Sequence, residues 1–355
     1  MRFQKKISQL LFESAPCYIH QNMTTADSKI SPMMLQWQQC KEEAASAILF
    51  FRLGDFYEAF HEDAKLLARE LDLTLTQRQQ TPMSGIPVHA AESYIDKLLE
   101  RGYKVAIAEQ IEDPKLTKGL VKREIVRILT PGTSLSSSLL LDKSNHFIAA
   151  LSQLGQLFGL ALFDLSTSDL RVIELDSLAE AQNELCKFTP KELIIPAKLE
   201  KKYAPQLDEL KKTFNCRIDQ LEDWRFEHEL TYGTLIQTFK VHSLDGFGLK
   251  GMVAAINSAG ALLSYVQDSL KHTLGPIRAI QPYSNKSYMA IDRTTLRHLE
   301  LVESSSGSKK HTLLASIDYT ETAMGGRELK RWILQPLQDL DEIHGRQEAI
   351  EALVD

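Results

Sequence analysis

The sequence predicts a multidomain α/β protein that ends in an all-α segment. The chain has 355 residues and 43% hydrophobic content, which is enough for several separate cores. Strand-length apolar runs alternate with amphipathic helical stretches over most of its length. After residue 301 the chain is expected to be almost wholly helical. These observations indicate α/β domains followed by helices.

The first strand and helix units follow one another near the start of the chain. Residues 31–45 open with Ser-Pro, a helix start, and suit one amphipathic helix. AILFFRL, residues 47–53, has the length and composition of a buried strand. Gly54-Asp55 then supplies a turn or bulge, and FYEAF resumes in strand-like alternation. Residues 61–73 follow as a helix with acidic residues in its first turn.

A second helix and two strands complete this first unit. Residues 93–110 fit a helix, a stop at Gly102 and then a strand. A further strand is expected in EIVRILTPGT, residues 124–133. The serine-rich residues 134–145 lack periodicity, so the first domain boundary is expected there.

The middle of the chain has the pattern of a second α/β domain on a mixed sheet. Residues 146–175 suit three strands joined by short turns that contain Gly, Ser and Asp. Residues 177–188 add a helix, and PKELIIP, residues 190–196, adds a strand. Residues 248–270, rich in Ala and Leu, predict a long helix.

The last part of the chain is expected to be helical. Pro336 ends a helix whose apolar positions are Met324, Leu329, Trp332 and Ile333. A final helix carries another apolar face, formed by Ile343, Ile350, Leu353 and Val354. This face continues to Asp355 without a stop signal, so the chain is expected to continue in a longer polypeptide or to need a partner.

Composition excludes several classes of protein. Charged residues make up 25% of the chain, and no apolar run reaches the roughly 18 residues that cross a bilayer, which excludes a membrane role. Residues 1–22 lack the features of a signal peptide and are expected to be a disordered extension. The cysteines show no metal-binding spacing and predict neither zinc nor a disulfide. They are Cys17, Cys40, Cys186 and Cys216.

One basic segment stands out from the net charge of -6. KLTKGLVKREIVR, residues 115–127, holds five basic residues against Glu124 alone. Such a segment could contact phosphates. A solvated, charged hairpin explains the same charges.

The sequence has no motif for an independent catalytic site. GFGLKG, residues 246–251, is the nearest glycine cluster to a phosphate loop, but Lys250 is followed by Gly instead of Ser or Thr. GxSxG and HExxH are absent. Glu62-Asp63 and the pair Asp339 and Asp341 occupy expected first turns of helices, where the helix dipole explains them.

A series of motifs resembles the MutS family of DNA mismatch-recognition proteins. FFRLGDFYEAFHEDA, LTLTQR, TPMSGIPVHAAESYIDKLLERGYKVAIAEQ and VRILTPGT resemble its mismatch-binding domain. GLALFDLSTSDLRVIEL resembles its connector domain. MAIDRTTLRHLEL, LLASIDYTETAMGGRELKRWILQPL and GRQEAIEAL resemble the beginning of its helical core, or lever, domain. The motifs run in order from about Met33 to Asp355.

The resemblance implies a small mixed α/β mismatch-binding domain at 23–130 and a ribonuclease-H-like connector domain at 131–266. An all-α, incomplete lever segment is implied at 267–355, after the extension at 1–22. Three features depart from the family pattern: this extension, the short QRQQTPM loop where relatives often carry a longer hairpin, and the missing remainder of the lever, clamp and ATPase domains.

The family's mismatch probe, a Phe-x-Glu motif, falls on Phe56 and Glu58. A phenylalanine at a strand end can enter the minor groove and stack on an unpaired base. Two-residue spacing puts both side chains on one face of a strand. Because DNA repels a carboxylate, Glu58 is expected to bond a base edge, either accepting from an imino N–H or, when protonated, donating to a purine N7. From the residues alone, a buried core phenylalanine is the alternative for Phe56.

The resemblance places three more residues near DNA. Arg78 and Met83 are expected near the minor groove, and Arg127 near the mismatch or its phosphates. Each has an ordinary structural alternative: Met83 as a core plug, Arg78 as a solvated loop residue, and Arg127 as part of an outward strand face.

The implied function is recognition of mispaired or unpaired bases in duplex DNA to initiate mismatch repair. The full-length family is a DNA-dependent ATPase that uses ATP and Mg²⁺, whereas this chain is expected to be no enzyme and to hold no cofactor or metal. Expected partners are double-stranded DNA with mismatches or small loops, a second copy in a homodimer and a MutL-type repair partner. The expected location is the bacterial cytoplasm, in association with the nucleoid.

Two alternatives come from other functional classes. A nuclease in the second domain would need clustered carboxylates for two metals, with Asp164, Asp169 and Glu174 as candidates. Turn and surface roles explain these residues more simply. A related protein that binds recombination or strand junctions is the other alternative, and the Phe-x-Glu pair argues against it.

Overall fold

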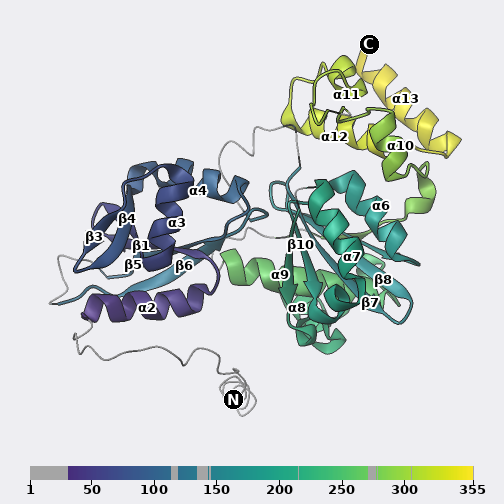
Figure 1. Ribbon diagram of the computed structural model, residues 1–355. Helices are drawn as coiled ribbons and strands as arrows, with labels where there is room; N and C mark the ends of the chain where they lie inside the picture. The colour runs from purple at the N-terminus through teal and green to yellow at the C-terminus, as the bar shows by residue number, and fades with distance from the viewer. Residues whose placement is uncertain are drawn as a thin grey trace.

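The computed structural model describes residues 31–112, 119–133, 143, 145–214, 216–270, 277, 279–304 and 306–354. They form two mixed sheets, each with helices against it, and a helical part near the carboxyl end (Figure 1). The α/β multidomain fold class predicted from the sequence is therefore confirmed. The expected extension at 1–22 and most of the serine-rich segment lie outside the described residues.

The first sheet has the strand order β3-β4-β2-β1-β5-β6. β1 and β5 are parallel, and every other neighbouring pair is antiparallel. Its strands are β1 (Ile48–Leu53), β2 (Phe56–Phe60), β3 (Thr76–Arg78), β4 (Thr81–Pro87), β5 (Val105–Gln110) and β6 (Arg123–Leu129). The β3–β4 hairpin was not among the predicted elements, because its short strands are too polar and Pro-containing to give a clear alternation.

Helices cover both faces of the first sheet. α2 (Pro32–Ala44) begins at Ser31, whose side chain accepts from the backbone N–H of Met34 as the Ser-Pro start predicts. Trp37 of this helix packs into one core layer. The opposite layer is covered by α3 (His61–Leu71) and α4 (Ala91–Glu100). α3 follows β2 directly, and α4 follows β4 after the short helix η1 (Val88–Ala90). Gly102 follows α4 with φ +84°, as expected for a stop residue.

The second sheet has the strand order β11-β10-β7-β8-β9-β12. The antiparallel meander β7-β8-β9 is flanked by parallel neighbours on both sides. Its strands are β7 (Phe147–Leu154), β8 (Leu157–Asp164), β9 (Asp169–Leu175), β10 (Glu192–Pro196), β11 (Arg217–Leu221) and β12 (Ile280–Pro282). The predicted three-stranded meander and the strand after it are present.

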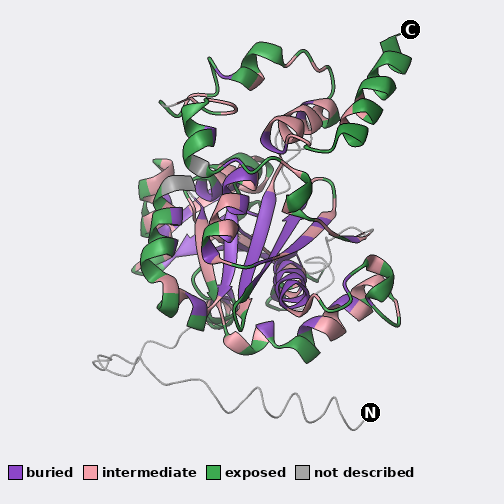
Figure 2. Ribbon diagram, turned by 90° about the vertical axis from the view of Figure 1, so that its right-hand side faces the viewer, coloured by how far each residue is buried: buried purple, intermediate pink, exposed green. Residues whose placement is uncertain are grey.

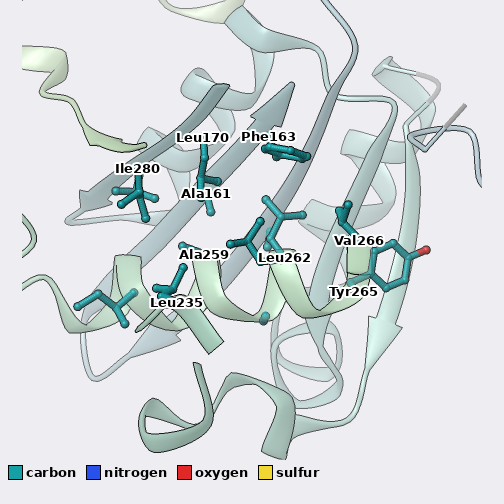
Figure 3. Close-up of a cluster of buried hydrophobic side chains, with 14 of the residues drawn as sticks. Ala161, Phe163, Leu170, Leu235, Ala259, Leu262, Tyr265, Val266 and Ile280 are labelled. Atoms are coloured by element: carbon teal, nitrogen blue, oxygen red, sulfur yellow. The ribbon is translucent and has the colours of Figure 1, made fainter. Parts of the chain in front are cut away.

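Two helical layers enclose the second sheet, whose strands are the buried centre of Figure 2. α6 (Leu178–Phe188) and α7 (Ala197–Phe214) cover one face. α8 (His228–Phe239) and α9 (Val253–Leu270) cover the other, together with the short helices η2 (Asp223–Phe226) and η3 (Asp245–Phe247). Figure 3 shows Ala259, Leu262 and Val266 of α9 directed toward Ala161 and Phe163 of the sheet. The long helix predicted at 248–270 begins only at Val253, after a turn.

The carboxyl-terminal part is helical and packs on the second unit. It contains η4 (Asn285–Ser287), α10 (Arg293–His298), α11 (Leu313–Ile317), α12 (Ala323–Leu334) and α13 (Leu340–Val354). Leu296 of α10 and Leu334 of α12 form a small core with Cys186 of α6. α12 ends before Pro336, as predicted. The final helix has no buried residue (Figure 2). Leu353 and Val354 near its end are largely exposed.

Three of the four cysteines lie in the described part of the chain. Cys40, Cys186 and Cys216 are buried there and form no disulfide with one another, and Cys17 lies outside the described residues. Among the described residues no helix is long and apolar enough to cross a membrane.

A close approach of α9 to β8 gives a stability prediction. A Cβ on Gly159 would lie 1.9 Å from the carbonyl oxygen of Ala254, so Gly159→Ala is expected to destabilise the chain by about 3 kcal/mol, measured by urea unfolding. Gly233 in α8 has nothing within 4 Å of the equivalent position. Gly233→Ala is the matched control and should stabilise by about 0.5–1 kcal/mol. Equal stability of the two variants would contradict this packing.

Candidate nucleic-acid interface

A two-residue turn places Phe56 at the start of β2. β1 and β2 pair with Leu53 opposite Phe56, so Gly54 and Asp55 form the whole turn. Gly54 has φ +61°, a left-handed conformation that favours glycine. The carbonyl of Asp55 accepts a hydrogen bond of 3.0 Å from the backbone N–H of Val88. This bond ties the turn to the end of β4.

Phe56 lies at the open end of one face of the sheet. Its side chain is 48% exposed, whereas Phe60 on the same face of the strand is buried. Trp37 of α2 covers the Phe60 end, with ring centroids 5.9 Å apart in an edge-to-face arrangement. Phe56 is therefore not a core phenylalanine, which was the alternative drawn from the residues alone.

Glu58 lies on the same face, between Phe56 and Phe60. It stands opposite Phe51 of β1 and Gly85 of β4, and its side chain is 15% exposed. A Cβ on Gly85 would come within 3.5 Å of Glu58 Cγ. That distance is an ordinary van der Waals contact, and the closest approach of such a Cβ would be 3.2 Å, to the carbonyl oxygen of Tyr57.

Arg78 forms an ion pair with Glu58. Its guanidinium nitrogen lies 3.1 Å from Glu58 Oε2, and the Arg78 side chain remains 49% exposed. Gln79 and Gln80 both have positive φ, which is the conformation of the tight turn between β3 and β4. Burial raises the pKa of Glu58, while the charge and hydrogen bond of Arg78 oppose that rise.

Met83 lies on the same face of the sheet as Phe56 and Glu58, whereas Arg127 lies on the opposite face. Met83 of β4 stands opposite Phe60 and packs partly buried on the core layer beneath α2. Arg127 of β6 stands opposite Ile107, whose side chain belongs to the other core layer. Because paired residues share a face, Arg127 lies on the opposite face from Phe56. The structure therefore brings together Phe56, Glu58, Arg78 and Met83, but not Arg127.

The structure describes only residues 119–127 of the basic segment at 115–127, and one of the cations in that part is buried. Arg123 is buried, donates to the carbonyls of Arg52 and Val121, and lies 5.2 Å from the ring centroid of Phe51. Lys122 pairs with Glu124 at 2.5 Å. The segment's remaining lysines, Lys115 and Lys118, lie outside the described residues.

A cluster of side chains that supports the turn before Phe56 was not predicted from the sequence. Arg52 donates to the carbonyl of Gly54, and its guanidinium lies 5.6 Å from the ring centroid of Tyr57. The Tyr57 hydroxyl donates to Glu109, and burial together with that carboxylate raises the pKa of Tyr57 to about 12. The cluster holds the turn before Phe56 from the opposite face. Only the strand register reveals it, since Arg52 and Tyr57 become neighbours across β1 and β2.

The carboxylates considered for a nuclease have structural partners. Asp164 accepts from Asn145 and Ser166, and Asp169 pairs with Arg171 at 2.5 Å. Glu174 accepts from the first backbone N–H groups of α9, at 2.8 and 3.2 Å. No group of three or more His, Cys, Asp or Glu suited to a metal ion occurs in the part of the chain that the structure describes. The geometry does not support the nuclease alternative.

Comparison with family models finds three consecutive matches to the MutS family. MutS domain I matches residues 31–138, MutS domain II matches 146–278, and MutS domain III matches 294–355. Together these matches cover most of the chain.

Curated relatives named DNA mismatch repair protein MutS show the same similarity. The protein from Protochlamydia amoebophila is 52% identical over 353 residues, which is 99% of this chain and 40% of the relative. That from Chlamydia trachomatis serovar L2b is 44% identical over 91% of this chain and 40% of its own length. That from Lachnoclostridium phytofermentans is 41% identical over 92% of this chain and 36% of its own length. The chain thus spans about 40% of the length of its curated relatives.

The Glu58–Arg78 pair gives a prediction that needs no DNA. Arg78→Met is expected to raise the pKa of Glu58 further, because the cation that opposes the effect of burial is removed. The change is measured by carbon-13 NMR titration of the Glu58 carboxyl. Lys65→Met, which removes an exposed pair with Glu62, is the control and should leave Glu58 unchanged.

The same variant has a pH-dependent effect on stability. The pKa of Glu58 is higher in the folded protein than in the unfolded chain. The Glu58 carboxyl therefore stabilises the fold at pH values below its unfolded pKa, and this stabilisation is lost as the pH rises through its folded pKa. Arg78→Met should enlarge that loss. We expect a cost below about 1 kcal/mol at pH 7 and almost none at pH 3, because the pair is partly exposed. An equal cost at both pH values would refute an ionic role for Arg78.

Proposed function

This chain belongs to the MutS family, and from that premise we propose that it recognises mispaired or unpaired bases in duplex DNA to initiate mismatch repair. The observation that carries the proposal is the half-exposed Phe56 beside Glu58, at the end of the sheet that α2 leaves uncovered. About half of the surface of Phe56 is open to solvent instead of packing in the core. The ring is available to a flat apolar surface such as a base.

Phe56 is proposed to act as the wedge. Its strand is paired on both sides, with β1 and with β4, so the ring is carried by a backbone that bends little. A rigid ring that enters the minor groove can stack on a base and open the adjacent step. Stacking of this kind contributes roughly 1–3 kcal/mol per base.

Discrimination follows from the cost of deforming the DNA. The wedge reads no base sequence, because every base has a flat face. A mispaired or unpaired base is already poorly stacked, so the duplex bends there at lower cost than at a paired step. The same ring therefore binds a mismatch more strongly than it binds paired duplex.

Glu58 is proposed to donate a hydrogen bond to a base in its protonated form. Burial already raises the pKa of this carboxyl in the DNA-free protein. In the complex the phosphates compete for the Arg78 guanidinium, and their negative charge raises the pKa further. A protonated carboxyl can donate to a purine N7, and it removes the repulsion between Glu58 and the polyanion.

The three other residues take supporting roles in this proposal. Arg78 is exposed enough to exchange its carboxylate partner for a phosphate. Met83 supports Phe60 and so keeps the probe strand in place. Arg127 lies on the other face, so its role would be a contact with phosphates away from the wedge.

For the whole protein, we propose the further activities of the family. These are ATP hydrolysis with Mg²⁺, assembly as a homodimer and binding of a MutL-type partner. The glycine cluster GFGLKG, residues 246–251, lacks the pattern of a phosphate loop: it forms a short helix and turns around Gly248 and Gly251, with no Ser or Thr after Lys250. No nucleotide-dependent step is assigned to these residues.

Removal of the Phe56 ring is the direct test. In the product of the complete reading frame, Phe56→Ala should lower the preference for a G·T or one-base-loop duplex over homoduplex by roughly 5- to 150-fold, the loss of one stacked base. Binding is measured by fluorescence anisotropy at fixed salt concentration, because phosphate contacts are salt-dependent.

A matched variant separates the wedge from general loss of apolar surface. Leu75 is 47% exposed in the loop before β3, close to the exposure of Phe56. Leu75→Ala should keep the full preference for mismatched duplex. Retention of the preference by Phe56→Ala would refute the wedge.

Glu58 gives a second, pH-based prediction. If the protonated carboxyl donates to the base, mismatch affinity of the wild-type protein should rise as pH falls from 8 to 6 at constant salt. Glu58→Gln, which keeps a donor but does not titrate in this range, should bind with a flatter pH profile. A wild-type profile as flat as that of Glu58→Gln would instead identify Glu58 as an ionised acceptor.

A further inference from the structure

The two α/β units meet around a completely buried carboxylate, Glu192. Glu192 is the first residue of β10, and its side chain has no exposed surface. One oxygen accepts from the Thr130 hydroxyl and, at 3.2 Å, from the backbone N–H of Gly132. The other oxygen accepts from the hydroxyl of Tyr265 on α9. Thr130 and Gly132 follow β6 of the first unit, so this carboxylate belongs to both units.

Lys104 of the first unit completes the group. Its ammonium lies 3.1 Å from Asp219 of β11, donates to the Tyr265 hydroxyl at 2.9 Å, and lies 3.8 Å from Glu192. Figure 3 shows the Tyr265 hydroxyl directed away from the labelled core side chains. Lys104, Thr130, Glu192, Asp219 and Tyr265 are called the interdomain latch.

Shape and burial show how closely the units fit. A Cβ on Gly132 would lie 2.7 Å from Ile148 and 2.9 Å from Glu192, so only glycine allows this approach. Arg217 of β11 also donates to the carbonyl of Gly102 in the first unit. The Glu192 side chain has no exposed surface, and this burial together with the nearby Asp219 raises the pKa of its carboxyl.

A buried ionic group of this kind permits few arrangements. An apolar interface can slide, because its contacts have no direction. Hydrogen bonds have direction, and a buried charge that loses a partner is strongly unfavourable. Movement of one unit against the other must therefore break the interdomain latch as a whole.

The interdomain latch is connected to the probe through the backbone. The carbonyl of Lys104 accepts from the N–H of Ile48 at 2.8 Å, where β1 begins. β1 runs directly to the turn before Phe56. A change at Lys104 is thus a change at the base of the strand pair that carries the ring.

We propose that the interdomain latch fixes the first unit on the second and that Thr130, Lys104 and Glu192 are positioning residues for mismatch recognition. The second part rests on the function proposed above. The interdomain latch sets the direction from which Phe56 meets the DNA, without itself contacting the duplex. The first part stands independently of DNA.

Thr130→Val and Thr130→Ser form the decisive pair. Valine keeps the shape of threonine but loses the hydroxyl, which donates to Glu192 and also accepts from the backbone N–H of Thr133 at 3.1 Å. Serine keeps both bonds. Amide hydrogen exchange, followed by mass spectrometry on the full chain, should rise at least tenfold at residues 130–133 in the valine variant. Residues 160–162, at the centre of β8, should be unchanged in both variants, and the serine variant should match wild type.

A second pair of variants shows whether faster exchange in Thr130→Val reflects only a folding defect at Thr130. Tyr265→Phe removes the opposite hydroxyl, and Tyr203→Phe removes a hydroxyl bond to Gln153 within the second unit alone. Only Tyr265→Phe should raise exchange at residues 130–133. If Thr130→Val matches Thr130→Ser, or if Tyr265→Phe matches Tyr203→Phe, the interdomain latch is overturned. In the second case faster exchange in Thr130→Val reports only the lost bond between Thr130 and the Thr133 backbone N–H.

The positioning role has its own measurement. In the product of the complete reading frame, Thr130→Val should reduce mismatch preference at least fivefold while homoduplex affinity stays within twofold, and Thr130→Ser should restore the preference. Faster exchange at 130–133 with unchanged preference overturns the positioning role and leaves the interdomain latch standing. The Phe56 experiment tests the proposed function separately, because hydrogen exchange involves no DNA.

Discussion

The pairing register of β1 and β2 is the constraint on which the proposed recognition surface depends. Leu53 opposite Phe56 leaves only Gly54 and Asp55 for the turn. Strand alternation then sends Phe56 and Glu58 to one face and Tyr57 to the other. A slip of one residue would exchange the faces, burying the probe and exposing Tyr57. The bond from Tyr57 to Glu109 on β5 holds the register that keeps Phe56 outside.

The buried core and the proposed recognition surface lie at opposite ends of β2. At the Phe60 end, Trp37 closes the core, and the whole sheet gains from burial there. At the Phe56 end an aromatic ring remains half exposed, which forgoes part of the free energy that its burial would contribute. Such a ring is compatible with folding because the rest of β2 is held by two neighbouring strands. The interdomain latch extends this rigidity to the second unit through Lys104.

Local signals in the sequence predicted much of the fold, but they could not predict contacts between segments that are distant in the sequence. The Ser-Pro helix start, the stop at Gly102 and the strand-length run before Phe56 are all encoded in adjacent residues. The Glu58–Arg78 pair requires the β3–β4 hairpin, whose strands give no clear alternation. Charge counting suggested a phosphate surface that included Arg123, yet its guanidinium is buried against Phe51. Glu192 gave no signal, because its partners come from segments distant in sequence.

The central claim is that the side chain at position 56 touches the mispaired base. Replacement of Phe56 by the photocrosslinking residue p-benzoylphenylalanine, in the product of the complete reading frame, tests it directly. Irradiation with a G·T duplex should give a covalent adduct at the mismatch, little adduct with homoduplex, and none when the same residue replaces Leu75. Equal crosslinking to mismatched and paired duplex, or adducts only at distant positions, would contradict the assignment of Phe56 as the probe.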